Sequence, residues 1–196
     1  MSNPGSPSSD RQTAPQTATQ DPRAQQTRSA IIASFNERVL EQPLDAINVS
    51  QLAQDAGVGR STLYEHFRNK DDVLIASMRH MLDALADTTR DQGGDPARVQ
   101  SLMEHLWENR LRARVMLTSD TAAVITRALA EAIESRLHAL PTTTWTLPVP
   151  MVAACLAECQ IALIRTWLQE RWPADATTMT HSLTRVTAAT RDSLKG

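Results

Sequence analysis

Apolar residues recur every three or four positions through almost every segment between residues 23 and 194, and this spacing constrains the fold more than any other feature. No segment alternates apolar and polar residues in the way that marks a half-buried strand. The 196 residues are enough for a small helical unit followed by a larger one. We therefore predict an all-α protein of about nine helices.

Residues 1–22 contain no Leu, Ile, Val or aromatic residue, so burial cannot offset the entropy of ordering them. We expect a disordered tail there. It lacks the apolar core of a signal peptide, and no run of 18 consecutive apolar residues follows. Only Cys155 and Cys159 occur, too few for a disulfide framework. These features predict a cytoplasmic protein without a membrane segment.

The expected helices begin and end at recognisable signals. The first runs from residue 23 to Pro43, and Asn48 caps the second, with Gln51 as its capping-box partner and Gly57 at its end. The third covers residues 60–67, and Asn69 caps a fourth that continues unbroken to about residue 90. Five further helices are predicted, over residues 97–109, 110–117, 121–140, 150–172 and 175–194.

Two short helices joined by the turn "AGVG", with a supporting helix before them, are typical of a helix-turn-helix, whose second helix can lie in the major groove of DNA. Arg60, Ser61 and Thr62 fall in the first turn of that helix, where backbone N–H groups favour phosphate. The net charge of -2 and pI of about 6.2 exclude a basic surface over the whole molecule. Any DNA contact must therefore be local.

The stretch "NVSQLAQDAGVGRSTLYEHFRNKDDVL", residues 48–74, closely resembles the signature of the TetR family of bacterial transcriptional repressors, and the resemblance extends over residues 23–85. It departs from the family pattern at Asn48, where Thr is common, and Glu65 places a negative charge beside the contact residues. The resemblance implies a homodimer whose heads bind a palindromic operator in double-stranded DNA, with a small-molecule effector releasing it. The DNA contacts carried over are Asn48, Ser50, Arg60, Ser61, Thr62, Tyr64, His66 and Lys70.

The resemblance also implies a division into the tail, a DNA-binding head over residues 23–85, and a ligand-binding and dimerisation domain over residues 86–196. The fourth helix, about residues 70–90, would be shared as a linker. The ligand-binding candidates are Met103, Leu106, Trp107, Met116, Leu117 and Trp145, although such residues at helical spacing are more often plain core. The expected dimer-interface residues are Cys155, Leu156, Cys159, Leu163, Trp167, Leu183 and Val186.

Several features stay open between a bland and a specific interpretation. We interpret the cysteine pair as buried apolar side chains, with a thiol sensor as the alternative. We interpret His105 as a solvated residue, with a metal ligand as the alternative. The arginines at positions 110, 112 and 114 suit an ion-paired surface or an anionic effector. No catalytic motif, metal site or cofactor is predicted. The alternatives to an effector-released repressor are a DNA-binding or partner-binding protein without an inducer, and a small-ligand carrier or enzyme that uses the C-terminal cavity.

Overall fold

The computed structural model describes residues 21–140, 143–169 and 174–196, so the predicted tail lies outside the described residues except for its last two. The described part contains ten α-helices and one short 3-10 helix and no strand element, which confirms the all-α prediction. The helix count exceeds the predicted nine because the fourth predicted helix is split in two.

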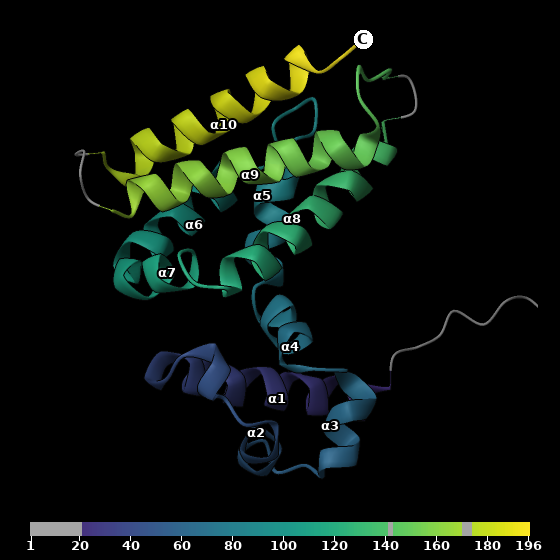
Figure 1. Ribbon diagram of the computed structural model, residues 1–196, viewed down its shortest axis with the longest axis vertical. Coiled ribbons are helices and arrows are strands. Elements are labelled where there is room, and N and C mark those ends of the chain that lie inside the picture. Colours follow the sequence, from purple (N-terminus) through teal and green to yellow (C-terminus); the bar gives the residue numbers. More distant parts are fainter. Residues whose placement is uncertain (1–20, 141–142, 170–173) are drawn as a thin grey trace, which may run out of the picture.

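The head is formed by α1 (Pro22–Glu41), the 3-10 helix η1 (Leu44–Ala46), α2 (Val49–Asp55), α3 (Arg60–His66) and α4 (Lys70–Ser77). It forms the lower unit of the molecule in Figure 1. Ile31 and Phe35 of α1 pack with Leu52 of α2 and Leu63 of α3 in the core of this unit. Gly57 has a φ of +67°, the left-handed conformation that lets the chain turn sharply from α2 towards α3.

The predicted continuous fourth helix is wrong, because the chain leaves helical geometry at Met78 (φ -93°, ψ 4°) between α4 and α5 (Arg79–Asp87). Ser77 lies at the break, and its Oγ donates to the carbonyl of Leu74 at 2.7 Å. A serine that hydrogen-bonds to the preceding turn in this way favours a bend in the helix. The break separates the head from the body more sharply than the sequence pattern indicates.

The body contains α5, α6 (Pro96–Glu108), α7 (Arg110–Met116), α8 (Thr121–His138), α9 (Val149–Trp167) and α10 (Ala176–Ser193). The last two helices lie along the top of the molecule, with α8 packed beneath α9 (Figure 1). Within the described residues, one helix, α9, is long and apolar enough to cross a membrane by length and composition. That signal is weak, because the core helix of a helical bundle passes the same test, and 39% of the apolar window is buried within this chain.

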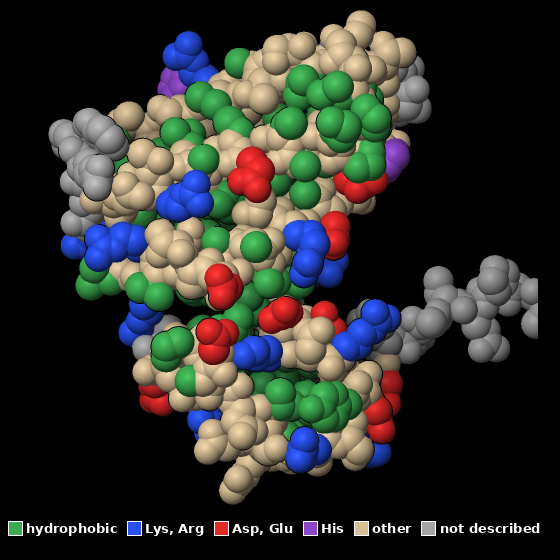
Figure 2. Space-filling model, viewed as in Figure 1, with side chains coloured by type: hydrophobic (Ala, Val, Ile, Leu, Met, Phe, Trp, Pro, Cys, Tyr) green, Lys and Arg blue, Asp and Glu red, His purple; other side chains and the backbone are tan. Residues whose placement is uncertain are grey.

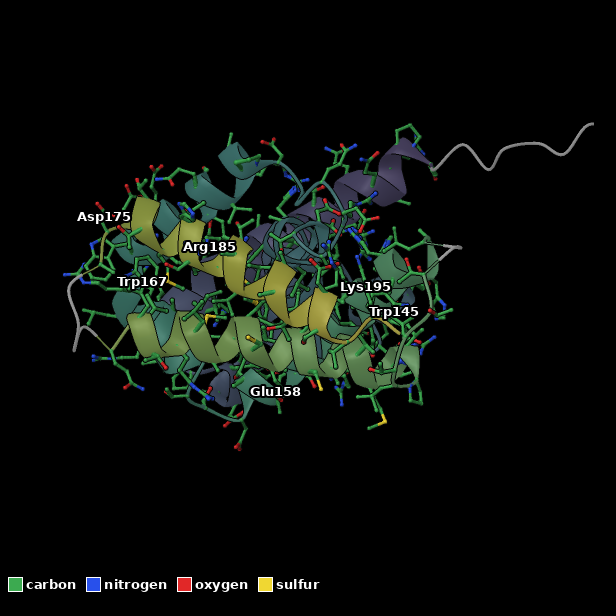
Figure 3. The ribbon with its side chains drawn as sticks, turned by 90° about the horizontal axis from the view of Figure 1, so that it is seen from above. Trp145, Glu158, Trp167, Asp175, Arg185 and Lys195 are labelled. Carbon is green, nitrogen blue, oxygen red and sulfur yellow. The ribbon has the colours of Figure 1, made fainter. Side chains whose placement is uncertain are left out.

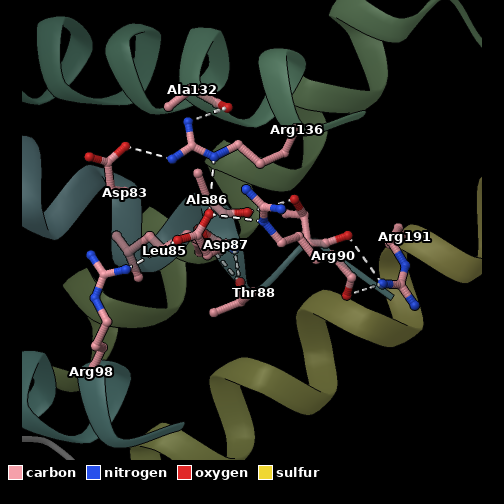
Figure 4. Close-up of polar contacts among 12 residues, drawn as sticks. Asp83, Leu85, Ala86, Asp87, Thr88, Arg90, Arg98, Ala132, Arg136 and Arg191 are labelled. Carbon is pink, nitrogen blue, oxygen red and sulfur yellow. Dashed lines mark hydrogen bonds and ion pairs between the residues drawn. The ribbon is translucent and has the colours of Figure 1, made fainter. Parts of the chain in front are cut away.

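Ion pairs and hydrogen bonds fix α5 to the rest of the body (Figure 4). Arg136 of α8 donates from Nη2 to Asp83 at 2.6 Å and from Nε to Asp87 at 3.1 Å. Burial alone would raise the pKa of Asp87, but hydrogen bonds from Arg136 and Arg90 outweigh it and hold this pKa below the ordinary value. The buried Arg191 of α10 donates to the carbonyls of Thr89 and Arg90 just beyond α5. These contacts join α5 to α8 and α10.

Candidate functional site

The two faces of α3 differ in the way that a DNA-contacting helix requires. Leu63 and Phe67 are buried against the head, whereas Arg60, Ser61 and Tyr64 are exposed. Tyr64 keeps 46% of its surface exposed, which is unusual for a large aromatic side chain. Gly59 precedes the helix without a side-chain cap, which leaves the first-turn N–H groups without that partner. Thr62 and His66 are half-buried at the edges of the exposed face.

The N-terminal end of α2 faces solvent near the same region. Asn48 caps the helix as predicted, because its Oδ1 accepts from the backbone N–H of Ser50 at 2.8 Å. The capping-box role predicted for Gln51 is wrong, since its Oε1 instead accepts from Arg38 Nη1 at 3.4 Å. Asn48 is exposed and Ser50 half-buried.

Lys70 differs from the other predicted DNA contacts because its side chain already has partners within the head. Its Nζ donates to the carbonyl of Leu44 at 3.0 Å and lies 3.8 Å from Asp45. The ammonium has three donors, so one carbonyl does not exhaust it. Lys70 therefore also joins α4 to η1.

Two arginines that the sequence pattern did not single out fix the position of the helix-turn-helix. Arg38 of α1 forms a close ion pair with Asp55 at the end of α2, and this hydrogen bond lowers the pKa of Asp55. Arg28 of α1 donates to the carbonyl of His66 at 3.4 Å, and its guanidinium lies 4.4 Å from the centre of the Phe67 ring. Because single arginines on an amphipathic helix carry no spacing signal, only the folded structure assigns them to α2 and α3.

A cavity of about 490 Å³ lies where the head meets the body. Its wall takes Phe35 and Val39 from α1, Leu74 from α4 and Met78 from the break between α4 and α5. The opposite side comes from α5, α6, α7 and α9, so the cavity touches both units of the protein. Its size and mainly apolar wall suit a small organic ligand.

Three of the six predicted ligand-binding residues line this cavity: Leu106, Met116 and Leu117. Met103 is fully buried in the core, and Trp107 stacks on Trp167 with 5.0 Å between ring centres. Trp145 lies at the far end of the body beside Lys195 (Figure 3). These three do not line the cavity: Met103 and Trp107 point from α6 into other packing contacts, and Trp145 lies outside any helix, in a bridge with Lys195. The sequence pattern missed the contribution of α1 and α4, which only the packing of the head on the body brings to the wall.

The outer face of α9 and α10 is open in the single chain. The two helices lie side by side when seen from above, with Glu158 on α9 and Arg185 on α10 (Figure 3). Met151 is 53% exposed and Val186 is 38% exposed, and Cys155 is exposed. A large apolar side chain left in solvent on the longest apolar helix favours contact with another molecule.

The predicted interface residues divide between this outer face and the core. Cys155 and Val186 are exposed, and Cys159 and Leu163 are half-buried. Leu156 and Leu183 have no exposed surface, and Trp167 is buried and donates from Nε1 to the carbonyl of Ala174 at 2.8 Å. These three therefore pack inside one chain and are not available as surface contacts. The prediction that both cysteines are buried is wrong for Cys155, which is exposed, while Cys159 is half-buried.

Comparison with known proteins agrees with the geometry of the head. The model of the family described as bacterial regulatory proteins, tetR family, matches residues 37–77, from the end of α1 to the end of α4. An HTH-type transcriptional regulator BetI from Serratia proteamaculans is 29% identical over 115 residues, which are 59% of this chain and 53% of that protein. The chain thus matches about half the length of this relative.

Two solved structures share the fold. A TetR transcriptional regulator from Rhodococcus sp. RHA1 superimposes with a TM-score of 0.54 and 16% identity, over 89% of this chain and 99% of that one. A second, from Streptococcus agalactiae 2603V, gives a TM-score of 0.51 and 20% identity, over 85% of this chain and 96% of that one. The head of this chain, residues 37–77, is thus similar to the tetR family of bacterial regulatory proteins, and the chain shares the all-α fold of the two solved regulators.

Proposed function

We propose that the protein is a cytoplasmic, homodimeric transcriptional repressor that binds a palindromic operator and is released by a small-molecule effector. The observation that carries this proposal is α3, a short helix with two apolar residues anchored in the head and a polar, aromatic face left in solvent. A helix of this kind after a tight turn suits the major groove of DNA. The proposal includes no catalytic step.

Within this proposal, Arg60 and Ser61 contribute most to base recognition, because they are exposed in the first turn of α3. Arginine can donate two hydrogen bonds to guanine, or bind a phosphate. Tyr64 is exposed one turn further along and can donate to a phosphate oxygen. The remaining proposed contacts lie around these: Asn48, Ser50, Thr62, His66 and Lys70.

The dimer is proposed to form through the outer faces of α9 and α10, so that four helices from two chains form a bundle. The support is the exposure of Met151, Cys155 and Val186 on these faces, together with the apolar character of α9. Sedimentation velocity of a Met151→Asp, Val186→Asp variant tests it. We expect monomers from the variant and dimers from the native chain; a variant that remains dimeric places the interface elsewhere.

The effector is proposed to bind the cavity between head and body. Because Leu74 and Met78 lie in its wall, a ligand there contacts both α4 and the break that follows it. A ligand that fits one head orientation better than another shifts the population towards it, which changes the separation of the two α3 helices. A coupling of roughly 1–3 kcal/mol weakens operator binding by about 5- to 150-fold.

A selection of random duplex oligonucleotides with the purified protein tests the DNA-binding proposal. We expect enrichment of a palindrome by the native chain and none by an Arg60→Ala, Tyr64→Ala variant. An Arg127→Ala variant is the control, because Arg127 is an exposed arginine on α8 far along the chain from the head. Equal enrichment by all three proteins would show that α3 does not contact the DNA. No enrichment by the native chain would contradict the DNA-binding proposal.

A further inference from the structure

A groove on the surface adjoins the cavity between head and body. This groove, of about 400 Å³, lies between the end of α1 with η1 on one side and α7 with the start of α8 on the other. Four residues line both spaces: Val39, Leu74, Arg112 and Met116. The groove therefore marks the side on which a molecule longer than the cavity would reach solvent, which is called the opening below.

The wall is divided by chemistry along this path. The inner part is formed by side chains such as Phe35, Met81 and Ile161, which offer only apolar surface. The charged wall residues are exposed: Glu37 lines the cavity, Arg112 lines both spaces, and the others line the groove. Acidic and basic side chains are visible around the narrow waist between head and body in Figure 2. An apolar interior with a charged opening fits an amphipathic ligand whose apolar part enters first.

The charges at the opening are mainly negative. The described lining residues include four with a carboxylate, one with a guanidinium, Arg112, and no Lys. Asp45 lies near Lys70, whose positive charge partly cancels its own, so it adds less to the negative charge of the wall. The wall also contains His105, whose Nδ1 lies 3.4 Å from Nδ2 of Asn109. The other three carboxylates that line the cavity or groove belong to Glu37, Glu41 and Asp120.

The position of Glu37 and Glu41 is unfavourable for the helix that carries them. They lie four residues apart in the last two turns of α1, so their charges repel each other and meet the negative end of the helix dipole. Neither forms an ion pair with a described residue. The charge of Glu41 acts on Arg38 only at longer range, because Arg38 is paired with Asp55. Both side chains are exposed, so they place negative charge beside the cavity and the groove.

We propose that the ligand of this cavity is an elongated amphipathic cation, with an apolar chain in the cavity and an amine or quaternary ammonium group at the opening beside Glu37 and Glu41. The effect of such a ligand on operator binding depends on the function proposed above, but its binding to the cavity does not. Three exposed carboxylates against one guanidinium attract a cation and repel an anion of the same length. Salt weakens this preference, because the charges at the opening are in contact with solvent.

The test compares three probes with the same ten-carbon chain: decyltrimethylammonium, 1-decanol and decanoate. Affinity is measured by titration calorimetry at pH 7.5 and low salt, below the aggregation limit of each probe. We expect the cation to bind most tightly and decanoate most weakly, with on the order of a tenfold difference between these two. Raising the salt concentration should bring the three affinities together.

A Glu37→Gln, Glu41→Gln variant assigns the preference to α1. It should lose most of the advantage of the cation over 1-decanol, while the affinity for 1-decanol stays the same. A Glu108→Gln variant is the matched control, because this residue lies on α6 but does not line the cavity or the groove. It should bind all three probes like the native chain.

Tighter binding of decanoate would overturn the proposal and make Arg112 the dominant charge. Equal affinities for the three probes would overturn it as well, since the charges would then contribute nothing. If no probe binds while the protein still selects a palindrome, this ligand class is wrong and the proposed regulatory function stands. If the cation binds but no DNA is selected, the cavity assignment stands and the regulatory function is wrong.

Discussion

Replacing Arg136 with Met removes the guanidinium that joins α5 to α8 while keeping a side chain of moderate length. The hydrogen bonds to the carboxylates of Asp83 and Asp87 are lost, together with a longer one to the carbonyl of Ala132. In a buried site each contributes about 1.5–3 kcal/mol. Here the side chains of Arg136 and Asp87 are 19% and 18% exposed, and Asp87 keeps Arg90 and Arg98 as partners. We therefore expect a total loss of about 2 kcal/mol in the free energy of unfolding.

Urea denaturation at fixed protein concentration measures this loss, because the stability of an oligomer changes with concentration. The matched control is Arg127→Met, an exposed arginine on the same helix, which should stay within about 0.5 kcal/mol of the native chain. If Arg136→Met behaves like this control, solvent screens the α5–α8 ion pairs and they do not hold α5 in place.

The pH dependence of the same comparison gives an independent check. The pKa of Asp87 is lowered in the folded protein, so this carboxylate stabilises the fold above its unfolded pKa of about 3.9. The contribution is lost as the pH falls through the lower folded pKa. The difference between native and Arg136→Met proteins should therefore be constant from about pH 5 to 8 and shrink below about pH 4. A difference that persists at low pH would show that packing, and not charge, causes it.

Three further changes test the turn, the cavity and α3. Gly57→Ala should cost about 1–2 kcal/mol in urea denaturation, because φ is +67° while no atom lies within 4 Å of the added carbon; an unchanged midpoint would contradict the left-handed turn. Ala113→Leu places a larger side chain in the cavity wall and should raise the thermal midpoint while weakening probe binding; unchanged probe affinity would place the ligand elsewhere. Arg60→Ala should reduce the salt slope of operator binding by about one if Arg60 binds a phosphate, whereas an unchanged slope with relaxed sequence preference would assign it to a base.

The amino-acid sequence determined the helices and the local structure of the head. Helical spacing, the caps at Asn48 and Asn69, and the turn at Gly57 depend on residues within a few positions of one another, so they can be recognised without the fold. The same holds for the exposed face of α3, because Leu63 and Phe67 lie one turn apart and fix which side is buried. Local signals misled at Ser77, where a competing local bond intervened, and at Gln51, whose side chain accepts from Arg38 of α1 instead of capping α2.

Tertiary structure decided which faces of the body helices are covered and where the cavity lies. Met103 and Leu106 have the same apolar chemistry, lie one turn apart and are both buried, yet only Leu106 lines the cavity. Likewise, α9 is apolar on more than one side, and only its packing on α8 and α10 shows that Leu156 is internal and Met151 external. The physical reason is that burial depends on contacts between residues far apart in the sequence, which the spacing within one helix does not specify.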